Sequence, residues 1–108
     1  MKVNDLVTHK KRTDLGIGCV SKVLKSSLKV NFGTYDVVTA KEPMLSPVDT
    51  SKCKTITYDE FRRRILSDKS QLNYAIVGNE LLRYVGIGWI TERVVTHEDL
   101  TKYPRVTQ

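Results

Sequence analysis

Short runs of β-forming residues follow one another closely in the first fifty residues, and this spacing limits the fold more than any other feature. Leu28, Val30 and Phe32 alternate with polar residues, which is the period-two pattern of a strand with one buried face. The other four runs lie at 5–9, 17–24, 35–39 and 44–48. Five strands in so short a segment predict a small closed barrel, because closure removes the exposed edges of an open sheet.

One helix is expected after a polar connector, 51–57. Thr57 and Glu60 have the spacing of a capping box, in which the Thr hydroxyl accepts a hydrogen bond from a backbone amide at the helix start. Apolar residues follow at helical spacing, so one face of the helix is expected to pack on a core. These apolar residues are Tyr58, Phe61 and Ile65. The helix is expected to end at 67–70.

The residues from 74 onward are expected to return to β structure. Gly78-Asn79 is a typical hairpin turn, so 74–77 and 80–85 are predicted to pair as antiparallel strands. A third strand is predicted over 86–95, through Trp89.

A second helix signal follows this third strand. Thr96 and Asp99 have the spacing of a weaker cap, before a short helical turn that Pro104 ends. The sequence therefore predicts a mainly β (α+β) protein in three parts. These parts are a small five-stranded barrel over 1–50, a polar connector with one amphipathic helix over 51–73, and a β-hairpin/three-strand unit over 74–108.

The tripeptide Gly-Ile-Gly occurs twice, at 16–18 and at 86–88. A dinucleotide-binding loop needs a third glycine and a following helix, and a Walker-type loop needs Gly-Lys-Ser/Thr; neither copy has these features. Nucleotide binding is therefore excluded, and no cofactor is implied. We expect the glycines to mark a bulge, a sharp bend or a close backbone approach at a strand entrance. A degenerate duplication is the alternative, because each copy is followed by similar residues.

The net charge, the cysteines and the lengths of the apolar runs indicate which partners and which compartment to expect. The net charge of +6 favours attraction to nucleic acid or to acidic proteins. Cys19 and Cys53 belong to no Cys-x-x-Cys motif or Cys/His cluster, which argues against a metal site. We find neither a signal peptide nor an apolar run of the roughly 18 residues that a membrane span requires, so we expect a cytoplasmic protein without a membrane partner.

Catalysis is not expected from these residues. His9 and His97 have no evident nucleophile partner, and the carboxylates Asp59 and Glu60 suit the first turn of a helix because of its dipole. Basic clusters and aromatic residues are the stronger candidates for function. The residues predicted to bind nucleic acid or an acidic partner are Lys10, Lys11, Arg12, Lys22, Arg62, Arg63 and Arg64. The residues predicted to bind a protein partner are Tyr35, Tyr84 and Trp89.

For each of these residues there is an alternative to a binding role, in which the side chain belongs to a solvated surface or to the core. The basic clusters are also compatible with a solvated surface, and three consecutive arginines on a helix point in different directions. Trp89 would anchor a protein partner if it were exposed, whereas a single tryptophan in a small domain is also a common core residue.

A series of short motifs in the first half is similar to a known family. In order, these are Asp5-Leu6-Val7, His9, Gly16–Val20, Leu28–Phe32 and Met44–Val48. The series resembles the small Tudor-like (SH3-like) barrels at the C-terminus of UvrD-type repair helicases and in CarD-type transcription factors. It covers residues 3–48. Two departures are Asn4 in place of a glycine, and a longer segment after His9 that carries the Lys10–Arg12 cluster.

The resemblance implies a five-stranded, non-catalytic barrel that binds RNA polymerase or a related partner through a strand edge. The second half resembles no family, although GIGWITERVVTHEDLTKYP is similar in style to small bacteriophage proteins. We therefore expect a non-enzymatic regulator or inhibitor that binds a component of the bacterial transcription or DNA-repair machinery. The alternative is direct, largely sequence-independent binding of DNA or RNA through the basic patches.

Overall fold

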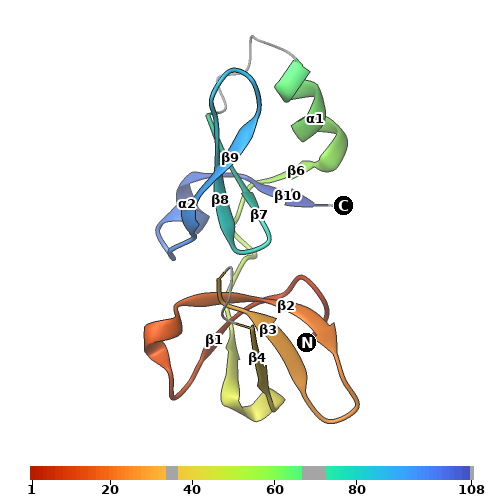
Figure 1. Cartoon of the computed structure of the whole chain (residues 1–108), viewed down its shortest axis with the longest axis vertical. Helices are drawn as coiled ribbons and strands as arrows, with labels where there is room; N and C mark the ends of the chain where they lie inside the picture. The colour runs from red at the N-terminus through yellow and green to blue at the C-terminus, as the bar shows by residue number, and fades with distance from the viewer. Residues whose placement is uncertain (34–36, 67–72, 108) are drawn as a thin grey trace. The chain divides into compact units, whose positions relative to one another are not determined.

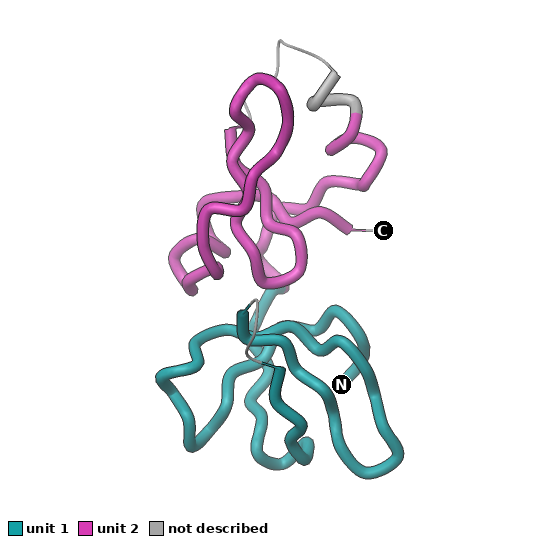
Figure 2. Tube along the Cα trace, in the orientation of Figure 1, with its two compact units in different colours: residues 1–50 teal, residues 51–108 magenta. Residues whose placement is uncertain are grey.

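The computed structural model describes residues 1–33, 37–66 and 73–107, in two compact units, residues 1–50 and 51–108 (Figure 2). Each unit is built on its own five-stranded sheet, which confirms the expectation of a mainly β protein. In the part of the chain that is described, no helix is long and apolar enough to cross a membrane.

The first unit is an antiparallel sheet with the strand order β4-β3-β2-β1-β5 (Figure 1). Its strands are β1 (Leu6–His9), β2 (Ile17–Val23), β3 (Leu28–Asn31), β4 (Val37–Ala40) and β5 (Leu45–Pro47). Two short 3-10 helices, η1 (Thr13–Leu15) and η2 (Glu42–Met44), precede β2 and β5. The sequence did not predict η1, which interrupts a polar loop.

One face of this sheet carries the hydrophobic core of the first unit. Leu28, Val30 and Phe32 are all buried, so the alternation predicted for this strand is confirmed. Val30 lies directly opposite Val20 of β2, and Val7 of β1 belongs to the same cluster. The side chains between these positions point to the other face, because successive residues of a strand alternate.

The expected closed barrel is not what the strand pairing shows. β5 returns to pair with β1, but within the described residues β4 pairs only with β3 and β5 pairs only with β1. The chain passes from β4 to β5 through η2, where Pro43 has no amide hydrogen to donate to a ladder. The sheet therefore keeps two edge strands, β4 and β5.

The second unit has the strand order β6-β10-β7-β8-β9. Its strands are β6 (Thr55–Thr57), β7 (Tyr74–Val77), β8 (Glu80–Tyr84), β9 (Trp89–Val94) and β10 (Arg105–Thr107), and its helices are α1 (Tyr58–Leu66) and α2 (Asp99–Lys102). The β7–β8 hairpin and the third strand, β9, are confirmed. The sequence reading of 51–57 as a polar connector was wrong, because β6 lies within it and pairs in parallel with β10.

The start of α1 follows the predicted cap. The amide of Glu60 donates a hydrogen bond to Oγ1 of Thr57 at 3.1 Å, and Phe61 is buried. Tyr58 differs from the expectation of a buried face, since half of its surface is exposed. It lies at the first position of the helix and stacks on Phe61 at a ring-centroid distance of 6.4 Å. The side chain of Ile65 and the predicted helix end at 67–70 lie outside the described part of the chain.

The two Gly-Ile-Gly segments have different structural roles. Gly16 follows η1 with a φ of 73°, and a Cβ at Gly18 would lie 2.5 Å from Cγ1 of Val30. The first segment therefore contains both a sharp bend and a close approach, as predicted. The second segment is the loop between β8 and β9; Gly86 has a φ of 91°, but a Cβ at Gly86 or Gly88 would meet no atom within 4 Å. The two sheets also differ in connectivity, so the structure gives no support to a duplication.

Candidate functional site: basic and apolar surfaces

The Lys10–Arg12 loop is held in place by the histidine that precedes it. Nδ1 of His9 accepts hydrogen bonds from the amides of Lys11 at 3.2 Å and Arg12 at 3.0 Å. The three basic side chains are exposed, and Arg12 forms an exposed ion pair with Asp14 at 3.7 Å. Sequence reasoning considered His9 as a catalytic candidate and as part of the barrel motifs, and it missed this role because the contact depends on the path of the loop.

Lys22 lies directly opposite Lys29 on the neighbouring strand. The register of β2 against β3 shifts between Val20 and Lys22, and the hydroxyl of Ser21 donates a hydrogen bond to the Lys29 carbonyl at 3.2 Å. Both lysines are exposed. Like charges directly opposite each other destabilise a sheet, and no carboxylate among the described residues forms an ion pair with either lysine.

The lysine pair was only half predicted. Lys22 was assigned to the basic surface, whereas Lys29 was not. The signal for Lys29 was the alternation itself, because a residue between buried Leu28 and Val30 must face away from the core. The pairing of Lys29 with Lys22 could not be predicted, because it depends on the register shift between β2 and β3.

The helical arginines belong to the second unit. The guanidinium of Arg62 lies over the Tyr58 ring, 5.8 Å from its centroid, which is a cation–π contact. Arg63 and Arg64 are in α1, but their side chains lie outside what the structure describes. Because the Lys10–Arg12 loop and Lys22 belong to the first unit, a site that combines both basic groups stays a prediction.

The structure brings Tyr84 and Trp89 together, while Tyr35 lies outside the described residues. Tyr84 and Trp89 are the last facing pair of β8 and β9, with ring centroids 5.4 Å apart. Trp89 is half-buried and stacks on Phe61 at 4.7 Å, within a cluster that includes Ile56. Its position therefore corresponds to the core alternative more than to an exposed anchor.

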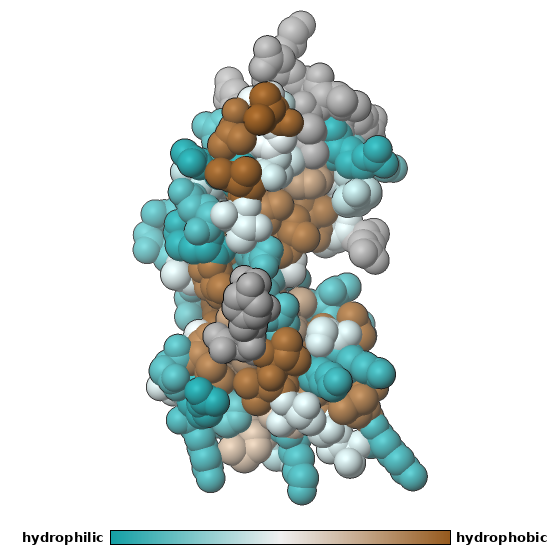
Figure 3. All heavy atoms as spheres, viewed as in Figure 1, coloured by the Kyte–Doolittle hydropathy of each residue, from teal (hydrophilic) through white to brown (hydrophobic). Residues whose placement is uncertain are grey.

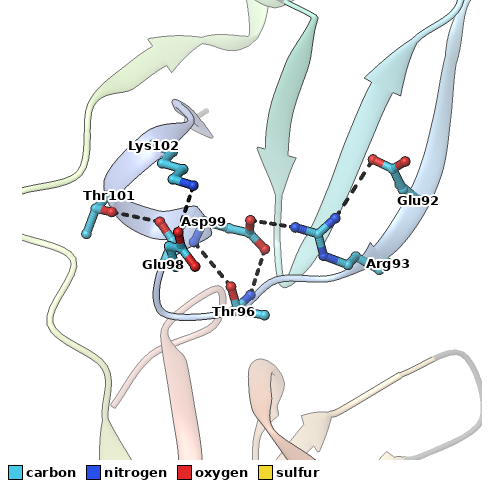
Figure 4. Close-up of polar contacts among 7 residues, drawn as sticks. All are labelled: Glu92, Arg93, Thr96, Glu98, Asp99, Thr101 and Lys102. Carbon is cyan, nitrogen blue, oxygen red and sulfur yellow. Dashed lines mark hydrogen bonds and ion pairs between the residues drawn. The ribbon is translucent and has the colours of Figure 1, made fainter.

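The carboxylates near His97 are engaged in contacts that shape the chain after β9 (Figure 4). Asp99 is buried; it accepts hydrogen bonds from Arg93 at 2.7 Å and from the Thr96 amide at 2.9 Å, and its own amide donates to Thr96 Oγ1. Glu98 pairs with Lys102 at 2.7 Å, and this hydrogen bond, with the attraction between the two charges, raises the pKa of Lys102 above its ordinary value. The predicted Thr96/Asp99 cap is confirmed.

A pocket of about 400 Å³ lies beside the β2–β3 turn and η2. Its lining includes Val23, Leu28, Lys25 and Lys41. Glu42, which also lines it, forms an ion pair with the terminal ammonium of Met1 at 2.9 Å. This lining combines aliphatic side chains with the cations Lys25 and Lys41 and the hydroxyl residues Ser26 and Ser27.

Two exposed apolar features complete the surface. The edge strand β4 begins with Val37, which is 56% exposed. The loop between β8 and β9 carries Ile87, which is 98% exposed. Sequence reasoning assigned Val37 to the strand run 35–39 and Ile87 to the predicted strand 86–95, and it proposed neither as a surface residue.

Comparison with known proteins finds no family, no curated protein and no solved structure that matches the chain. Function is therefore inferred from the fold of each unit and from the surfaces described above.

Proposed function

We propose that this chain is a non-enzymatic interaction protein, of bacterial or phage origin, that binds a protein of the transcription or DNA-repair machinery as a regulator or inhibitor. The observation that carries the proposal is the connectivity of the first unit. Four strands follow one another as an antiparallel meander, and β5 returns to pair with β1. The return of the last strand to the first is a pairing that small five-stranded barrels share, and it supports the Tudor/SH3-like reading of residues 3–48, although β4 and β5 do not pair with each other among the described residues.

The edge strand β4 is the surface that suits such a partner. An edge strand presents unpaired amides and carbonyls, and an extended peptide can add to it as a further strand. β4 is paired with β3 over all four of its residues, so its backbone is already extended for this purpose. Val37, exposed on this strand, supplies an apolar side-chain contact.

The test is an affinity purification from bacterial lysate with the tagged full chain as bait, after nuclease treatment and at low and moderate salt. We expect one protein complex to be recovered in stoichiometric amount. Val37→Asp should abolish recovery by placing a charge on the edge. Val3→Asp is the matched control, because Val3 is a similarly exposed valine of the same unit (49%) outside every strand. Recovery that disappears with nuclease, or equal loss with both variants, would contradict the proposal.

Direct binding of nucleic acid is the second candidate, and the Lys22–Lys29 pair is the observation that favours it. Two adjacent lysines that pair with no carboxylate of the described residues destabilise the sheet, and the phosphates of a nucleic acid would compensate their charge. The Lys10–Arg12 loop would add backbone contacts from the same unit. Because phosphate contacts do not read bases, this binding would be largely independent of sequence.

A further inference from the structure

The loop between β8 and β9 holds a fully exposed isoleucine in an ordered setting. The amide of Val85 donates to the carbonyl of Gly88 at 3.0 Å, and the hydroxyl of Tyr84 donates to the carbonyl of Gly86 at 3.1 Å. Behind the loop, Tyr84 packs on Trp89, which packs on Phe61. The loop that presents Ile87 is thus braced from within the second unit, and a braced loop loses less entropy on binding.

The two glycines beside Ile87 leave the space around it open. Gly86 is explained by its backbone, since a φ of 91° is unfavourable for other residues. Gly88 has no such explanation: its φ lies outside the left-handed region, and a Cβ there would meet no atom within 4 Å. A glycine that the fold does not require is expected where another molecule approaches the backbone closely.

Exposed apolar surface continues on both sides of Ile87. Val85 and Ile90 are each more than two-fifths exposed, and we call these three residues the apolar tip. Figure 3 shows hydrophobic surface over this end of the hairpin. Single exposed aliphatic residues are common on protein surfaces, whereas a cluster at the end of a braced loop is a typical contact site.

The charges around the apolar tip indicate the chemistry of its partner. Residues 84–91 include no Lys, Arg, Asp or Glu, and the charged residues that flank this stretch in the sequence, Arg83 and Glu92, form an ion pair at 3.8 Å. Nucleic acids and anionic membranes are bound through uncompensated cations, and the stretch 84–91 that forms the tip contains none. Tip-to-tip pairing of two copies is also disfavoured, because three side chains are far fewer than the roughly 20–30 residues a side of a stable interface. An uncharged concave surface on another protein matches the tip best.

We propose that the apolar tip is a second contact with the protein partner, in which Ile87 enters an apolar pocket and the partner surface lies against Gly88. This inference rests on the proposed function, since it requires that the partner be a protein. Ile87 is the anchor, and Val85 and Ile90 form the rim of the contact. The hairpin itself undergoes no rearrangement on binding, because its loop is already held by the two hydrogen bonds described above.

The experiment uses the full chain and the partner that it recovers from nuclease-treated lysate. The affinity of the purified partner is measured for the wild type and for three variants: Ile87→Asp, Gly88→Val and Val77→Asp. We expect Ile87→Asp and Gly88→Val to weaken binding by roughly tenfold or more, as for an interface hot spot. Val77→Asp is the matched control, an exposed aliphatic residue next to the β7–β8 turn, and should bind as the wild type does. Unchanged Trp89 fluorescence would verify that each variant is folded.

A photo-crosslinking residue at position 87 distinguishes the possible occupants of the tip. We expect a crosslink to the recovered partner, mapped to an apolar pocket, and none from position 98. Crosslinking to a second copy, or Ile87-dependent sedimentation with phosphatidylglycerol vesicles, would overturn the inference. If the Ile87→Asp variant still binds the partner as the wild type does, the inference about the apolar tip is overturned, whereas the proposed function is not. Recovery of no nuclease-resistant protein by any bait would overturn both.

Discussion

At the scale of single residues, Gly18 shows how a missing Cβ allows the first core to close. Val30 and Phe32 pack against the backbone of β2 at this position, so a side chain there would overlap both. The sequence predicted a close approach at the first Gly-Ile-Gly. It did not indicate which atoms approach, because these residues are twelve and fourteen positions later and reach Gly18 only through the tertiary fold.

We expect Gly18→Ala to destabilise the protein by about 1–3 kcal/mol, the usual cost of overpacking a core. The reason is the 2.5 Å separation between the added Cβ and Cγ1 of Val30. Urea unfolding followed by far-ultraviolet circular dichroism measures the change. Gly88→Ala is the control; it meets no neighbour and should change stability by less than about 0.5 kcal/mol. Equal midpoints for the two variants would contradict the packing role of Gly18.

At the scale of elements, local signals were readable from the sequence and distant pairings were not. The β7–β8 hairpin follows from Gly78-Asn79, and the start of α1 follows from Thr57 and Glu60, because each signal lies within four residues. β6 and β10 pair in parallel, with Thr55 opposite Arg105. Neither strand has a strong pattern of its own, so each depends on a partner about fifty residues away.

The turn before α2 combines a local signal with one that the sequence did not reveal. Thr96 and Asp99 cap each other, as their spacing predicts, but Arg93 also donates to the buried carboxylate of Asp99. We expect Asp99→Ala to cost about 2 kcal/mol, since it removes a cap and a charge-assisted hydrogen bond. Thermal unfolding tests this. Glu98→Ala removes only an exposed pair with Lys102 and should leave the midpoint unchanged. A similar loss in both variants would show that burial of Asp99 is unimportant.

At the scale of the whole molecule, the net charge of +6 was the clearest functional signal in the sequence. Which basic residues lie close together could be seen only in the folded structure. The two predicted basic clusters fall in different units. Lys22 and Lys29 are brought opposite each other by the register of two strands. The charge composition therefore predicts the class of partner, which is nucleic acid or an acidic protein. The register of the strands identifies the lysines that would contact this partner.

The lysine pair that this register creates, Lys22 and Lys29, allows a test that distinguishes the two candidate functions, binding of a protein and binding of nucleic acid. If nucleic acid binds the lysine pair, the double variant Lys22→Glu with Lys29→Glu should weaken binding to a duplex of random sequence. It should also reduce the slope of log affinity against log salt by about 2, one for each lost phosphate contact. The double variant Lys52→Glu with Lys54→Glu is the control, because it also takes the net charge from +6 to +2.

Fluorescence anisotropy at several salt concentrations measures both quantities. A larger effect at positions 22 and 29 than at positions 52 and 54 would place phosphate on the first sheet. Equal effects would show that the overall positive charge attracts nucleic acid without a defined site. In that case an acidic surface of a protein partner is the contact that we propose for Lys22 and Lys29. Steering by complementary charge would then bring the β4 edge and the partner together.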